Sequence, residues 1–84
     1  MQWVDAKHYN TFVQLPERLP FPNGTQLGIM DGDVAGYIYP VFVGKEGKTL
    51  RWFWCHSRTQ ARPAYEEELK MTMEDAKLHI EQLK

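Results

Sequence analysis

The dipeptide Asp31-Gly32 constrains the fold most, because it separates two apolar runs at residues 25–30 and 34–43. Such a pair is a strong signal for a two-residue β-hairpin, since glycine accepts the positive φ that a type I′ turn requires. The pairing that follows places Leu27 opposite Gly36. The sequence therefore predicts two antiparallel strands joined by this turn.

A second turn signal lies at residues 44–47, where two glycines enclose two charged residues. It predicts a four-residue loop that leads into a third strand over residues 48–57. Pro40 cannot donate a hydrogen bond to the ladder, so the middle strand should bend or bulge there. Residues 8–15 favour extended structure and form a candidate fourth strand, with a short helix starting near Asp5 as the alternative.

The two loops predict which residues lie opposite each other, and alternation along each strand then assigns the faces. The four-residue loop pairs Tyr39 with Trp52 and Tyr37 with Trp54. One face is then expected to carry mainly aliphatic groups: Leu27, Ile29, Val34, Ile38, Phe42, Phe53 and Cys55. The other face is expected to carry the large rings, with their neighbours: Tyr37, Tyr39, Val41, Leu50, Trp52, Trp54 and His56.

The C-terminal segment MTMEDAKLHIEQLK predicts a helix with its own start signal. Thr72 is a good N-cap residue, and Asp75 three positions later gives a variant of the capping box. An apolar stripe follows at helical spacing: Met73, Ala76, Ile80 and Leu83. We expect this stripe to cover the aliphatic sheet face, with Gly36 allowing close approach. The predicted fold is one α+β domain over residues 1–84, a three- or four-stranded antiparallel β-meander with this helix packed on one face.

Composition limits the function more than it identifies it. The 84 residues are 43% hydrophobic and 25% charged, as in ordinary globular proteins, and the formal net charge of −1 provides no overall basic field. Residues 45–62 nevertheless form a local basic strip, with five basic residues against one acidic. A single cysteine cannot form an intrachain disulfide, and no apolar run is long enough to span a membrane. With no signal-peptide pattern at the start, a cytoplasmic protein is expected.

The predicted aromatic face is the main candidate binding surface, together with nearby basic residues: Tyr37, Tyr39, Trp52, Trp54, Lys48, Arg58 and Arg62. Three interpretations remain open. The rings could be core, covered by the N-terminal residues. They could form a protein interface, including self-association, because exposed aromatic groups mark contact sites. They could also bind single-stranded nucleic acid, where each stacked base contributes about 1–3 kcal/mol.

Catalytic and metal sites have weaker support. Cys55 and His56 are neighbours on a strand and point to opposite faces, so His56 cannot easily act as a base for Cys55. His79 is the better partner, because its helix is predicted to lie on the face that holds Cys55, yet no third group is evident to orient it. Residues 31–33 lack the further oxygen ligands of a calcium loop, and there is no zinc spacing. We expect no catalytic residue, cofactor or metal ion.

The ending LRWFWCHSR…MTMEDAKLHIEQLK resembles many small uncharacterised phage and prophage proteins. Their shared plan is a Trp-rich last strand, a polar loop and a helix with a Thr or Ser cap. The resemblance covers roughly the second half of the chain, and it implies a short accessory protein that acts by binding. We therefore expect a non-catalytic binding protein with a protein partner, and single-stranded nucleic-acid binding through the same surface is the alternative.

Overall fold

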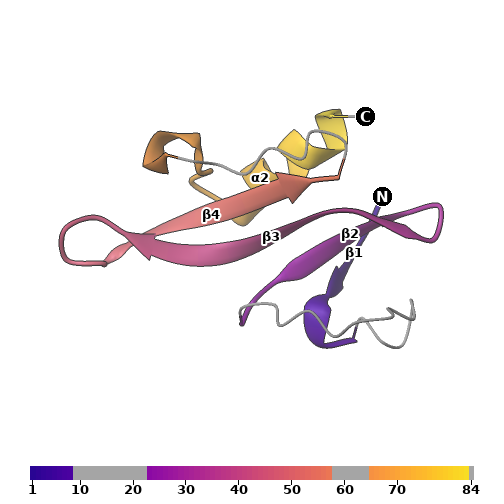
Figure 1. Ribbon diagram of the computed structural model, residues 1–84, viewed down its shortest axis with the longest axis horizontal. Coiled ribbons are helices and arrows are strands. Elements are labelled where there is room, and N and C mark those ends of the chain that lie inside the picture. Colours follow the sequence, from indigo (N-terminus) through magenta and orange to yellow (C-terminus); the bar gives the residue numbers. More distant parts are fainter. Residues whose placement is uncertain (9–22, 58–64, 84) are drawn as a thin grey trace.

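The computed structural model describes residues 1–8, 23–57 and 65–83, and it contains a four-stranded antiparallel sheet with one α-helix on one face (Figure 1). The strand order is β1-β2-β3-β4, which is also the order in the chain. The predicted α+β meander is thus confirmed. The elements in chain order are β1 (Gln2–Asp5), η1 (Ala6–His8), β2 (Gln26–Met30), β3 (Asp33–Val43), β4 (Thr49–His56), η2 (Glu66–Glu68) and α2 (Met73–Gln82).

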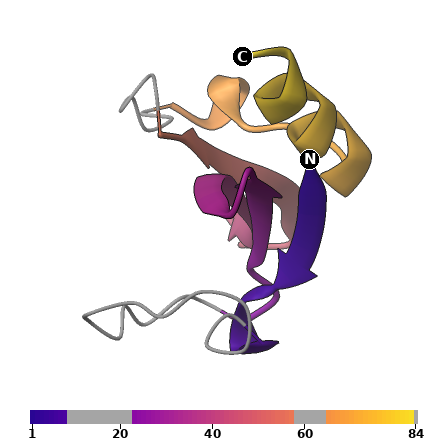
Figure 2. The same cartoon turned by 90° about the vertical axis from the view of Figure 1, so that its right-hand side faces the viewer.

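The fourth strand is β1, to which the sequence analysis assigned no element. It pairs with β2 at the edge of the sheet, with Trp3 opposite Gly28, and η1 follows it directly. Figure 2 shows that β1 runs along the sheet with its N-terminal end close to α2. The predicted strand over residues 8–15 lies almost entirely outside the described residues.

The first hairpin has the predicted turn. Asp31 has a φ of 53° and Gly32 a φ of 83°, so both central residues have the positive φ of a type I′ turn. Beyond the turn the ladder shifts by one residue at a β-bulge, which places Gly28 opposite Gly36 instead of the predicted Leu27. Ala35 is the additional residue on β3, and its carbonyl accepts a hydrogen bond from the Ser57 amide at 2.9 Å.

The second hairpin has a five-residue loop, so the predicted register of β3 and β4 is wrong by one residue. Val43 pairs with Thr49, and the loop takes positive φ at Gly44 and Gly47. Tyr39 consequently lies opposite Phe53, not Trp52. A shift of one residue moves every side chain of β4 to the other face.

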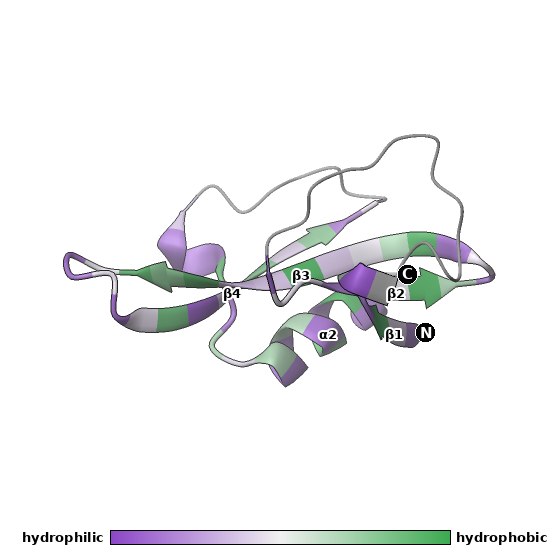
Figure 3. Cartoon of the chain, turned by 90° about the horizontal axis from the view of Figure 1, so that it is seen from below, coloured by the Kyte–Doolittle hydropathy of each residue, from purple (hydrophilic) through white to green (hydrophobic). Residues whose placement is uncertain are grey.

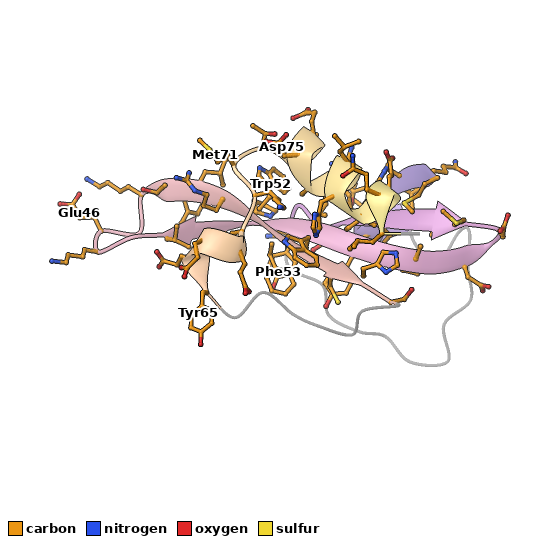
Figure 4. All side chains as sticks on the ribbon, turned by 90° about the horizontal axis from the view of Figure 1, so that it is seen from above. Glu46, Trp52, Phe53, Tyr65, Met71 and Asp75 are labelled. Atoms are coloured by element: carbon orange, nitrogen blue, oxygen red, sulfur yellow. The ribbon has the colours of Figure 1, made fainter. Side chains whose placement is uncertain are left out.

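This register reverses the predicted faces of β4. Trp54 lies opposite Ile38 and, like Trp52, packs towards α2, whereas Phe53 lies on the opposite side of the sheet (Figure 4). The core on the α2 side consists of three fully buried side chains with four partly buried ones against them. They are Ile38, Ala76 and Ile80, with Trp3, Trp52, Trp54 and Met73.

The helix itself agrees with its sequence signals. The Thr72 hydroxyl accepts a hydrogen bond from the Asp75 amide at 3.1 Å, which is the predicted N-cap. Ala76 and Ile80 are the buried positions of the stripe, while Leu78 on the opposite side is exposed. The helix therefore buries the predicted stripe, but against the tryptophan side of the sheet.

The segment before the helix covers part of the free edge of β4. Lys70 forms an antiparallel bridge with Trp52, with N···O distances of 2.7 and 3.0 Å. The Trp54 indole N–H donates to the Glu68 carbonyl at 2.9 Å. These bonds pair edge groups that would otherwise be open to another strand.

Substituting Gly36 tests the close packing of β4 and α2 around this position. A Cβ at this position would lie 2.6 Å from the Cys55 carbonyl oxygen and 3.1 Å from Cγ2 of Ile80. We expect Gly36→Ala to lower the free energy of unfolding by about 1–3 kcal/mol, because backbone cannot move aside as a side chain can. Urea denaturation followed by circular dichroism measures the loss.

Gly28→Ala is the matched control, because Gly28 lies opposite Gly36 in the same sheet. Its added Cβ would come closest to Sδ of Met1, at 2.7 Å, which is the end of a flexible side chain. A smaller loss is expected for this variant. Equal losses for the two variants would contradict the packing described for Gly36.

Candidate functional site

The structure does not bring the predicted aromatic face together as one surface. Trp52 and Trp54 lie on the α2 side, whereas Tyr37 and Tyr39 lie on the opposite side with Phe53. Lys48 lies in the loop between β3 and β4. Arg58 and Arg62 fall outside the described residues. The prediction that these rings share one face was therefore wrong, because the loop between β3 and β4 has one residue more than predicted.

The tryptophans on the α2 side have structural roles. The Trp3 indole N–H donates to Oε1 of Glu81 at 3.0 Å, and Nζ of Lys77 lies 5.6 Å from the centre of the Trp3 ring. The Trp54 indole N–H also has a hydrogen-bond partner, the Glu68 carbonyl. Partly buried rings whose polar atoms are bonded within the fold are typical of a small core. The first of the three interpretations therefore describes the tryptophans, with α2 as their cover.

On the opposite face, Tyr37, Tyr39 and Phe53 form a stack of near-parallel rings. The ring centres of Tyr39 and Phe53 are 4.5 Å apart with an interplanar angle of 19°, and those of Tyr37 and Tyr39 are 6.2 Å apart at 11°. Tyr39 and Phe53 thus each turn one ring face to the other. All three rings are half-buried, and a base could stack only on the faces that remain.

A part of the β3–β4 hairpin extends beyond the other strands, and we call residues 41–51 the arm. The first residue of β2, Gln26, pairs with Ile38, so among the described residues only β4 pairs with β3 beyond that point. On the other edge, the bridge to Lys70 ends at Trp52. Figure 1 shows the arm projecting past both β2 and α2.

Large apolar side chains are exposed on the α2 side of the arm. Phe42 is 68% exposed and Leu50, directly opposite it, is 42% exposed. Met71 is 69% exposed, and because the bridge at Lys70 is antiparallel, it lies towards this end of β4. We call Phe42, Leu50 and Met71 the apolar shelf. Figure 3 shows hydrophobic residues at the end of β3 and hydrophilic ones in the loop beyond.

Charged groups of opposite sign lie at the two ends of the shelf. The loop at the tip of the arm carries Lys45 and Lys48 against Glu46, a formal charge of +1, whereas Arg51 lies opposite Val41 at the base of the arm. Exposed acidic groups of the first turn of α2, Glu74 and Asp75, lie at its base on the shelf side, with Lys70 beside them, whereas Glu66, Glu67 and Glu68 of η2 lie towards the other side of the sheet with Tyr65 (Figure 4). Figure 4 shows Asp75 near Met71, on the same side of the sheet as Trp52.

An open groove of about 310 Å³ adjoins the shelf between α2 and the segment before it. Met71, Lys70 and His79 are among the residues that line it. The His79 ring packs on Trp54 with centres 4.3 Å apart, and its Nε2 is buried with no hydrogen-bond partner among the described residues. Burial, and then the charges of Lys70 and His56, lower the pKa of His79 below its ordinary value of 6.5.

The pairing considered for catalysis is not formed. Cys55 lies opposite Tyr37 on the face away from α2, so the sheet separates it from His79. The prediction that the helix covers the face of Cys55 was wrong for the same reason as the aromatic face. Within residues 1–8, 23–57 and 65–83, no group of three or more His, Cys, Asp or Glu side chains could hold a metal ion.

Comparison with known proteins finds no significant match to a family model, to a curated protein or to a solved structure. In the described part of the chain, none of the helices has the length and apolar character needed to cross a membrane. The function must therefore be argued from the surfaces alone.

The pH dependence of stability tests the environment of His79. Because folding lowers its pKa, the unfolded chain takes up a proton at a higher pH than the folded chain does. The contribution of neutral His79 to the free energy of unfolding is then fully present above pH 6.5. The free energy of unfolding should fall as the pH is lowered from 6.5 towards the folded-state pKa. Urea denaturation at a series of pH values measures this fall.

His79→Phe is the matched variant, because it keeps a ring against Trp54 and removes the titrating group. The free energy of unfolding of this variant should fall less over the same pH range. Identical pH profiles would show that His79 is not desolvated.

Proposed function

We propose that this chain is a non-catalytic protein-binding domain that contacts its partner through the apolar shelf. The exposure of Phe42, Leu50 and Met71 on one side of a projecting arm is the observation that carries this proposal. Single apolar residues scattered over a surface are normal, but a contiguous group marks a contact site. Resemblance of the C-terminal half to small phage proteins is consistent with an accessory protein that acts by binding.

The form of the arm gives a second reason. A two-stranded hairpin alone is at best marginally stable in water, and it gains stability when another layer covers one face. Neither α2 nor β2 covers residues 41–51, although Phe42 and Leu50 form a cross-strand pair that could be buried. A bound protein would supply the missing layer.

Nucleic-acid binding receives less support than protein binding. Tyr39 and Phe53 cover one face of each other, and the tryptophans take part in the core. Lys48 lies in the loop beyond Val43, about 20 Å along the strand from Tyr37 at 3.3 Å per residue. Lys45 and Lys48 thus lie far from most of the ring stack, and Arg51 is the one basic residue of the arm on the face of the stack, two positions from Phe53.

Photocrosslinking tests the proposal. A photoreactive phenylalanine analogue placed at Phe42 should form covalent adducts with the partner protein, and mass spectrometry would locate them. Tyr65 is the matched control, because it is an aromatic residue of similar exposure, 65%, and points to the other side of the sheet (Figure 4).

The same analogue at Tyr65 should give few adducts or none. Thermal melting must show that both labelled proteins are folded. Equal adduct yields from the two positions, or no adducts from Phe42, would contradict the shelf as the contact site.

A further inference from the structure

We infer that the partner of the apolar shelf is a second copy of this chain. The two copies form a two-fold symmetric dimer in which the arms pack face to face and run antiparallel. This inference rests on the proposed function and adds the identity of the partner. Its basis is the distribution of charge along the shelf, with Lys45 and Lys48 at the tip and Glu74 and Asp75 of α2 at the base.

The shelf is complementary to itself in charge. A two-fold axis just above the Phe42–Leu50 pair, parallel to the sheet and across the strands, would place the loop of one arm over the base of the other. Lys45 and Lys48 of each copy would then meet acidic groups of its partner, with Asp75 beside Met71 as the nearest candidate on that side of the sheet. Symmetric dimers require this kind of self-complementary surface, in which each contact occurs twice.

The apolar contacts follow from the same arrangement. Phe42 and Leu50 lie between the loop and Trp52, so rotation about the same axis brings each pair against its own copy. Met71 would extend the contact at both ends. Exposed large apolar groups at the centre and charged groups at the rim reproduce the usual organisation of a protein interface.

The internal ion pair of the arm does not oppose this arrangement. Nζ of Lys48 lies 3.5 Å from Glu46, and both side chains are more than three-quarters exposed. Such exposed pairs contribute little to stability, so Lys48 can exchange this partner for an acidic group of the other copy at small cost. The contact area of the arm is smaller than a standard interface, and we therefore expect a reversible dimer whose population depends on concentration.

Sedimentation equilibrium of the purified full-length chain tests the dimer. The unmodified protein should associate to a dimer as its concentration rises. Phe42→Ser should raise the dissociation constant about tenfold or more, because each dimer loses two buried rings. Tyr65→Ser is the control, since Tyr65 is also an exposed aromatic residue, 65% exposed, but points to the other side of the sheet (Figure 4).

A charge exchange tests the orientation of the two copies. Lys48→Glu alone and Asp75→Lys alone should each weaken the dimer, and the double variant Lys48→Glu/Asp75→Lys should restore most of the loss. Circular dichroism must show that α2 is intact in the Asp75 variants, because an acidic group in the first turn stabilises a helix. High salt should weaken the unmodified dimer.

The outcomes separate this inference from the proposed function. A chain that is monomeric at every concentration overturns the dimer, and so does a dimer that Phe42→Ser leaves unchanged. Adducts from the Phe42 analogue with a different protein, in a chain that stays monomeric, overturn the dimer and leave the shelf as a binding site. A dimer that weakens with both single charge variants and recovers in the double variant supports the antiparallel arrangement.

Discussion

The burial of Trp52 and Trp54 beneath α2 is the constraint on which the rest of the structure depends. Each large ring can remove about 150–250 Å² from water, and a chain of 84 residues has few other ways to build a core. With these rings on the α2 side, alternation along β4 sends Phe53 and Cys55 to the opposite side. Two consequences follow from the placement of the tryptophans: Cys55 is separated from His79, and Tyr39 stacks on Phe53.

The arm results from a mismatch in length between neighbouring elements. β3 has eleven residues, whereas β2 has five and α2 has ten. Neither the neighbouring strand β2 nor the helix α2 therefore extends as far as the hairpin does. The uncovered part still carries apolar residues, Val41, Phe42 and Val43, and Phe42 is the exposed one. The partner proposed above would bury these exposed apolar groups, which add nothing to the stability of the free chain.

The local elements were predictable where the signal lies within a few residues. The turn at Asp31-Gly32 and the cap at Thr72 each depend on short-range conformation and hydrogen bonding, and both are present as predicted. The candidate binding surface was not predictable in the same way. It depended on the register of β3 and β4, and a loop of four or five residues fits the sequence GKEGK equally well. No feature of the neighbouring residues favours one loop length over the other, although the loop length decides which side chains of β4 lie on which face.

The sequence by itself determined that this chain forms an antiparallel meander with a capped C-terminal helix, because turn chemistry and hydrophobic periodicity act over short distances. Only the tertiary structure decided which face the helix covers. That choice compares the burial of two tryptophans with the burial of a phenylalanine and a cysteine, and it involves β1 and Trp3 from the other end of the chain. Phe42 and Leu50 lie on the face that the helix covers but beyond its reach, and they are therefore exposed.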